Sequence, residues 1–158
     1  MEDATKSGVT ANSYATATEA DDLLDVFYGA EDWLSVSDDD KSRLLITATS
    51  MLDELKLQYG LYSVDPLQAL NFPLVTPVPG DDGFDKVKMA CIHQAFHIFE
   101  NNDTIREARA GKIQGIRQEQ IAKMKKISFG FNPWTKYSTK ALKLLSSYID
   151  MSVKIGRG

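Results

Sequence analysis

Apolar residues recur with helical spacing in four segments of this chain, which predicts a mainly α-helical fold. In the first segment Thr18 is the expected N-cap, Asp21 the third helical residue and Gly29 the end. The apolar stripe of this segment consists of Ala20, Leu23, Leu24 and Phe27. We therefore expect a short amphipathic helix before residue 30.

The second segment has the clearest helix start in the sequence. Ser37 supplies a capping hydroxyl, and the three aspartates after it place negative charge at the positive end of a helix dipole. Apolar residues then recur at the i, i+4, i+7, i+8 spacing: Leu44, Ala48, Met51, Leu52, Leu55 and Tyr59. This pattern predicts a long, half-buried helix that stops near Gly60.

The segment 63–83 holds four of the five prolines and is expected to be irregular. The third helix, over 84–101, is apolar on more than one side, which predicts the central element of the core. Its apolar residues are Val87, Ala90, Cys91, Ile92, Ala95, Phe96, Ile98 and Phe99.

The pattern changes after residue 110. Ile127, Phe129 and Phe131 alternate with other residues, which favours a small β-hairpin or an extended arm within 111–131. Ser138 then begins a last helix. We therefore predict one domain over residues 1–150, a bundle of about four helices with the hairpin or arm before the last of them. Residues 151–158 are expected to form a flexible tail.

The composition is that of an ordinary folded domain. The 158 residues suffice for one core, with 43% hydrophobic and 25% charged residues. Cys91 is the only cysteine, so no internal disulfide can form and a reducing cytoplasm is the expected compartment. The first residues lack a secretory leader and no apolar run is long enough for a bilayer, so no membrane partner is expected.

The net charge of −4 hides a division along the chain. Residues 1–85 carry 17 Asp and Glu against 4 Lys and Arg, and residues 86–158 carry 5 against 14. The two halves could simply pair within one fold. They could also meet opposite charges on neighbouring chains, or the basic half could contact nucleic acid.

Candidate catalytic chemistry is sparse. His93 and His97 lie one helical turn apart with Glu100 next on the same face, which offers three metal ligands for a hydrolase. The glutamate that follows the first histidine of a zinc protease is missing, so packing is the preferred reading. The turn from Gly80 to Gly83 has the composition of a calcium loop but lacks its alternating ligands. We expect no enzyme activity, no metal and no cofactor.

Basic and aromatic residues interleave late in the chain. Lys123, Lys125 and Lys126 precede Phe129, Phe131 and Trp134. Rings that stack on bases beside lysines that meet phosphates are typical of a single-strand nucleic-acid surface. Tryptophan anchors protein interfaces equally well, so the pattern supports either partner.

Several short motifs resemble, in order, those of tailed-phage head-tail connector (adaptor or head-completion) proteins. They are Asn12-Ser13-Tyr14, Ala20-Asp21, Trp33, Asp40-Lys41, Ala48-Thr49, Leu52-Asp53 and the run Gln68-Ala69-Leu70-Asn71-Phe72-Pro73. The resemblance covers about residues 10–100. Some members of the family carry the label DnaT-like single-stranded DNA-binding protein.

The motif residues have structural rather than catalytic character. Phe72 is expected to be a buried ring followed by a proline that fixes a turn. Gln68 and Asp53 are expected to tie that turn to the second helix through hydrogen bonds to the backbone.

The resemblance implies a ring subunit of the virion neck, made in the host cytoplasm, with about a dozen copies between portal protein and tail or tail-terminator proteins. Genomic DNA would pass through the ring. Lys123, Lys125, Lys126 and Trp134, together with Lys154 and Arg157 of the tail, are the expected interaction residues, with the tail gripping the portal. The alternative function is a single-stranded DNA-binding module.

Overall fold

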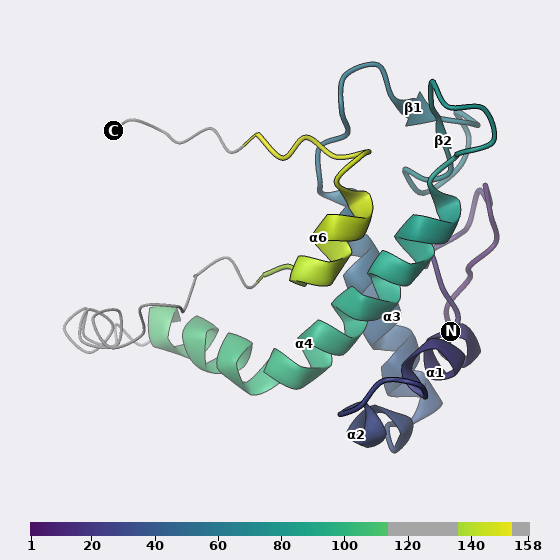
Figure 1. Cartoon of the computed structure of the whole chain (residues 1–158). Helices are drawn as coiled ribbons and strands as arrows, with labels where there is room; N and C mark the ends of the chain where they lie inside the picture. Colours follow the sequence, from purple (N-terminus) through teal and green to yellow (C-terminus); the bar gives the residue numbers. More distant parts are fainter. Residues whose placement is uncertain (114–135, 153–158) are drawn as a thin grey trace.

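Helix α4 (Phe84–Ile113) packs against both α3 (Asp38–Asp53) and α6 (Thr139–Leu145) in the computed structural model, which describes residues 1–113 and 136–152 (Figure 1). The short helices α1 (Ala17–Leu24) and α2 (Glu31–Leu34) lie at one end of this core. Strands β1 (Tyr62–Ser63) and β2 (Leu74–Val75) form a small antiparallel sheet at the other end. The predicted mainly α, single-domain fold is confirmed.

The core forms where α3 and α4 meet. Eight apolar residues of these helices are at most 2% exposed: Leu45, Ala48 and Leu52 from α3, and Val87, Ala90, Cys91, Ile92 and Ala95 from α4. Thr49 lies among them, and its hydroxyl is 3.2 Å from the Cys91 sulfur. The central role predicted for the third helix is confirmed, although α4 runs to Ile113, beyond its predicted end.

The first helix begins two residues earlier than predicted. Thr16, not Thr18, is the N-cap, and its hydroxyl accepts a hydrogen bond from the Glu19 amide at 3.2 Å. The Glu19 carboxylate returns the bond by accepting from the Thr16 amide at 3.0 Å. This reciprocal pair satisfies two backbone donors at once, whereas the Asp21 carboxylate is committed to Trp33 and Lys41 instead.

Helix α3 begins as predicted and ends early. The Ser37 hydroxyl accepts from the Asp40 amide at 3.3 Å, which confirms the cap. The helix stops at Asp53 rather than near Gly60, because the backbone after it pairs with residues 148–150, which follow α6. The Gln58 amide donates to the Tyr148 carbonyl at 2.8 Å, and Tyr59 is fully exposed.

The proline-rich segment contains β2 and the second residue of β1, which corrects the prediction that it is irregular throughout. Tyr62 pairs with Val75, and Ser63 pairs with Leu74. The hairpin or arm predicted within 111–131 falls mostly in 114–135, outside the described residues, and its first three residues belong to α4.

The turn around the buried Phe72 is tied to α3 by Asp53, as predicted, whereas the hydrogen bonds that Gln68 donates brace the turn itself rather than joining it to the helix. The Gln68 amide group donates to the carbonyls of Leu70 at 2.7 Å, Asn71 at 3.1 Å and Pro73 at 3.2 Å. Asp53, at the end of α3, accepts from the Asn71 amide at 3.3 Å. The Phe72–Pro73 peptide bond is cis.

The described chain stays attached to the core up to Asp150, whose amide donates to the Lys56 carbonyl at 2.7 Å. Met151 is already 51% exposed, and residues 153–158 of the predicted tail lie outside the described residues. None of the helices in the described ranges combines the length and apolar character that crossing a bilayer requires.

Candidate interaction surface

None of the six predicted interaction residues can be placed. Lys123, Lys125, Lys126 and Trp134 belong to 114–135, and Lys154 and Arg157 to 153–158, so all six lie outside the described residues. Their roles remain predictions. The surface that the structure describes is the acidic one, formed by the N-terminal part of the chain.

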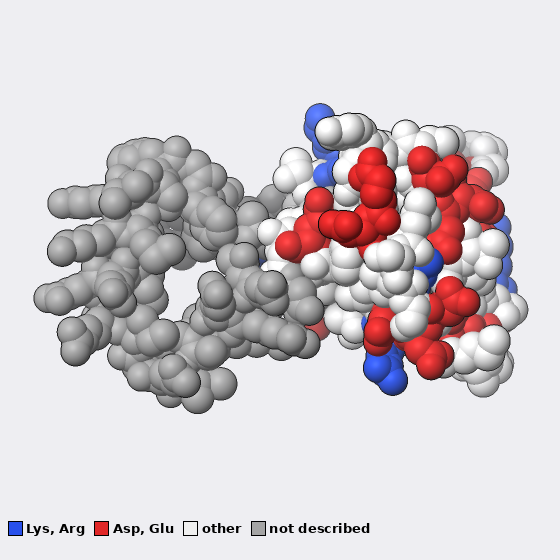
Figure 2. All heavy atoms as spheres, turned by 90° about the horizontal axis from the view of Figure 1, so that it is seen from below, with Lys and Arg blue, Asp and Glu red and all other residues white. Residues whose placement is uncertain are grey.

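Exposed carboxylates gather where α1, α2 and α3 meet. Figure 2, which views the molecule from this end, shows acidic atoms spread over much of the described face with few basic atoms between them. Six of these acids form no ion pair with a described lysine or arginine: Asp22, Asp25, Glu31, Asp32, Asp38 and Asp39. Their charge is therefore available to a partner.

A buried polar contact holds the three helices together beneath this surface. The Trp33 ring is fully buried, and its Nε1 donates to the Asp21 carboxylate at 2.9 Å. The other oxygen of Asp21 accepts from the buried Lys41 ammonium at 2.8 Å. One carboxylate thus links α1 to α2 and α3. Because the Lys41 ammonium is charged and buried, removing the Asp21 carboxylate would leave this buried charge without its ion-pair partner.

Four apolar side chains stand among the carboxylates. Val26 is 79% exposed, Phe27 38%, Tyr28 102% and Leu34 42%. The prediction that Phe27 belongs to the buried stripe of α1 is wrong, because α1 ends at Leu24 and the chain turns away. We call these four residues, with Asp22, Asp25, Glu31 and Asp32, the α1–α2 surface.

Phe27 is nevertheless held in place from beneath. The Lys140 ammonium lies 3.9 Å from the centre of its ring, and the His93 ring meets it edge-on with centres 5.5 Å apart. A fixed aromatic ring loses little conformational freedom when a partner covers it. Phe27 is therefore preorganised for binding, whereas Tyr28 projects freely beside it.

An open groove borders the α1–α2 surface. Residues of α2, α3 and the turn between them line it, and Phe99 of α4 contributes an aromatic wall. Phe99 packs edge-on against Trp33, with ring centres 5.8 Å apart. The groove therefore continues the mixed acidic and apolar character of the surface.

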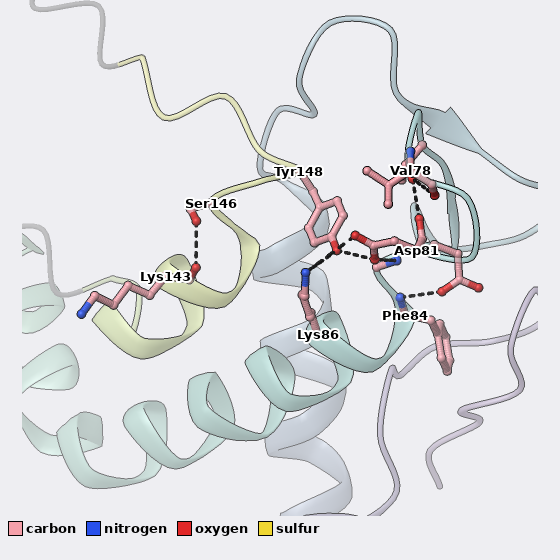
Figure 3. Close-up of polar contacts among 10 residues, drawn as sticks. Val78, Asp81, Phe84, Lys86, Lys143, Ser146 and Tyr148 are labelled. Atoms are coloured by element: carbon pink, nitrogen blue, oxygen red, sulfur yellow. Dashed lines mark hydrogen bonds and ion pairs between the residues drawn. The ribbon is translucent and has the colours of Figure 1, made fainter.

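The opposite end carries a polar cluster with a structural role (Figure 3). The Tyr148 hydroxyl donates to Asp81 at 2.6 Å and accepts from the Lys86 ammonium at 3.0 Å. The bond from Tyr148 lowers the pKa of Asp81, while burial and then Asp81 raise the pKa of Tyr148. The cluster fastens the residues after α6 to the turn that begins α4.

The Gly80–Gly83 turn uses its carboxylates internally. Asp81 also accepts from the Gly83 amide at 3.2 Å, and Asp82 accepts from the Phe84 amide at 3.0 Å. Lys6 pairs with Asp82 at 2.7 Å. Backbone capping therefore explains both aspartates, in agreement with the turn reading of the sequence.

The two histidines of α4 belong to no three-ligand group among the described residues. Among the described residues there is no group of three His, Cys, Asp or Glu side chains placed to hold a metal ion. His93 is buried, and burial followed by the charge of Lys140 lowers its pKa to about 4. Asn101 contacts His97 Nδ1 at 3.2 Å. The geometry matches the packing interpretation of this pair.

Sequence reasoning missed the α1–α2 surface, although a signal was present. The run from Asp25 to Asp32 places Val26, Phe27 and Tyr28 between acids and ends in the acidic pair Glu31-Asp32. Apolar residues in such a polar setting are poor core candidates. The helical stripe alone did not reveal this, because Phe27 fits its spacing.

Comparison with known proteins assigns the family. The whole chain, residues 1–158, matches the family model described as "putative DnaT-like ssDNA binding protein". No curated protein and no solved structure gives a significant match. Because the match spans the full sequence, the chain belongs to this DnaT-like family.

Proposed function

We propose that this protein is a structural subunit of the neck of a tailed phage, a head-tail connector that forms a ring between portal and tail. The observation that carries the proposal is the α1–α2 surface. It joins exposed aromatic and aliphatic side chains with carboxylates that form no ion pair among the described residues, a combination that suits a protein partner. Phosphate groups would be repelled there.

The ordered motifs of residues 10–100 supply the connection to the phage neck. The structure gives the most specific of them a scaffolding role, because Gln68, Asp53 and Phe72 form one hydrogen-bonded, buried turn. A subunit of this kind works through its surfaces. Its partners would be copies of itself, the portal protein and tail or tail-terminator proteins, and DNA would only pass through the ring.

Electron microscopy of the purified protein mixed with the portal particles of its own phage tests this function. The expected result is an added ring on the portal, with about a dozen copies, the number that the resemblance to head-tail connector proteins implies. Portal particles that remain bare at high protein concentration would refute it.

The C-terminal residues provide a second test of the same proposal. We propose that Lys154 and Arg157 grip the portal, since Met151, shortly before them in the chain, is already 51% exposed. A chain truncated after Asp150 should keep its melting temperature and fail to sediment with portal particles. Complete necks built from the truncated chain would exclude this role for the tail.

A single-stranded DNA-binding module is the second candidate function. The family description favours it, as does the basic and aromatic sequence of residues 123–134. Anisotropy of a fluorescent oligonucleotide across a salt series decides between the two. A nucleic-acid binder loses affinity steeply as salt rises, with a slope set by the number of phosphates contacted. No binding at low salt would dismiss this candidate.

A further inference from the structure

The α1–α2 surface exposes several large apolar side chains to solvent. Val26, Tyr28 and Leu34 are 79%, 102% and 42% exposed, and they lie between acids that have no described ion-pair partner. Such a patch on a subunit commonly marks the place where another chain binds. The chemistry of the occupant follows from its two components: it must carry cations and it must carry apolar or aromatic groups.

We propose that this surface is the docking site for residues 123–134 of a second copy of the chain. Those residues carry Lys123, Lys125 and Lys126, followed by Phe129, Phe131 and Trp134. No Asp or Glu occurs between Glu119 and Asp150, so the segment is uniformly basic. The inference rests on the proposed function, because it supplies the contact that joins neighbouring subunits of the ring.

The charges of the two surfaces are complementary. Asp22, Asp25, Glu31 and Asp32 face the solvent without described ion-pair partners, and three lysines within four positions can pair with them. Complementary potentials speed association and fix its orientation. This surface places four such acids beside exposed apolar side chains.

The aromatic side chains add the specificity that charge alone lacks. A lysine over the exposed Tyr28 ring would make the kind of contact that Lys140 already makes with Phe27 at 3.9 Å. Val26 and Leu34 offer apolar area to the rings of the incoming segment. Aromatic and cationic residues of this type dominate binding energy in protein interfaces.

A ring requires the donor segment to come from a neighbouring copy. Within each chain Lys136 pairs with Glu54 at 2.6 Å, next to the end of α3, and Lys140 lies 3.9 Å from the centre of the Phe27 ring, so the experiment has to separate contacts between copies from contacts within one chain. Contact between unlike surfaces of successive copies is heterologous, and a heterologous contact generates a ring when the rotation closes.

Carboxyl-to-amine crosslinking of the full chain tests the contact directly. An equal mixture of ¹⁴N- and ¹⁵N-labelled protein is treated with a zero-length carbodiimide at low salt, and mixed-isotope peptides identify crosslinks between copies. We expect Lys123, Lys125 or Lys126 of one copy joined to Asp22, Asp25, Glu31 or Asp32 of another. Crosslinks confined to one isotope, or directed to other carboxylates, would overturn the proposal.

Matched variants separate this contact from general stickiness. Tyr28→Ala should lower the yield of mixed-isotope crosslinks about tenfold, the effect of losing one dominant interface side chain. Tyr59→Ala removes an equally exposed ring at the other end of the molecule and should leave the yield unchanged. An equal effect of both substitutions would overturn the proposal.

A charge swap gives the decisive comparison. A chain with Asp22→Lys and Asp25→Lys should not crosslink with itself, nor should a chain with Lys123→Glu and Lys125→Glu. A chain that carries all four changes should regain the contact, because both charge signs are reversed together. Failure of this chain to associate while it keeps the parent melting temperature would count against the site.

The outcomes distinguish the contact from the wider function. If the parent protein forms rings on portal particles and the Tyr28→Ala and acidic-surface variants form them equally well, the docking site is overturned and the connector function stands. The expected crosslinks without any portal binding would support the docking site and remove the connector function. Protection of the three lysines by an oligonucleotide, with no crosslink between copies in its absence, would overturn the docking site in favour of nucleic-acid binding.

Discussion

His93 should make the protein sensitive to mild acid. The imidazole is only 8% exposed, in contact with the Phe27 ring and close enough to Lys140 to feel its charge. Burial first, and then the charge of Lys140, lower its pKa from 6.5 to about 4. In the unfolded chain the His93 imidazole is protonated below about pH 6.5, whereas in the folded chain it is protonated only below about pH 4.

The size of the effect follows from this difference. Stability rises with pH wherever the unfolded state binds more protons, so it falls as the pH drops from 6.5 towards 4. With these two pKa values, lowering the pH from about 7 to about 5 costs the folded state about 2 kcal/mol through His93 alone. Most carboxylates stay ionised over this interval, which limits their contribution.

The assay compares the parent protein with His93→Gln, which is neutral at every pH. Urea denaturation at pH 7 and pH 5 gives the free energy of unfolding of each protein. The parent should lose about 2 kcal/mol more than the variant over this interval. Lys140→Met tests the contribution of the Lys140 charge to the lowered pKa of His93. It removes the repelling charge and should make the loss of stability between pH 7 and pH 5 smaller.

Nuclear magnetic resonance gives the direct refutation, since the chain contains two histidines and each can be assigned. A folded-state pKa of His93 near its ordinary value of 6.5 would show that the ring is solvated and that the argument is wrong. Equal acid sensitivity of the parent and His93→Gln would lead to the same conclusion.

Substitutions at three further positions test the scaffold. Gly83→Ala should cost about 2 kcal/mol or more in thermal melts, because φ is +72° and the new Cβ would lie 2.9 Å from the Phe72 ring; a neutral result would contradict the close approach. Tyr14→Phe removes the hydroxyl that donates to Asp53 and accepts from the Phe72 amide at 3.2 Å, and should cost about 1–3 kcal/mol in urea denaturation. Ser37→Ala should cost about 1 kcal/mol and Ser37→Gly only a few tenths, and the reverse order would argue against the cap.

The sequence by itself determined the elements whose causes are local. Ser37 and Ser138 were recognisable as caps because the hydroxyl and the amide it satisfies are three positions apart in the chain. The apolar residues of α4 lie on more than one side of the helix, which marked it as central, because a helix of this kind is buried by neighbours on several sides. Gln68 and Asp53 were recognisable as ties of the Phe72 turn because proline and a buried ring leave carbonyl and amide groups that need partners.

Tertiary structure decided the features that depend on residues far apart in sequence. The Asp21 carboxylate accepts hydrogen bonds from Trp33 and Lys41. Glu19 instead forms the capping pair with Thr16, and α1 therefore starts earlier than predicted. Helix α3 ends at Asp53 because the chain that follows pairs with residues near 149, a competition that no local pattern reveals.

The candidate site also belongs to the tertiary level. Its acids come from the end of α1, from α2 and from the start of α3, and only the packing of these helices around Trp33 brings them to one face. Phe27 satisfies the helical spacing of a core residue, yet the helix ends before it. Whether an apolar side chain is buried depends on where its element stops and on what packs over it, and those are properties of the folded chain.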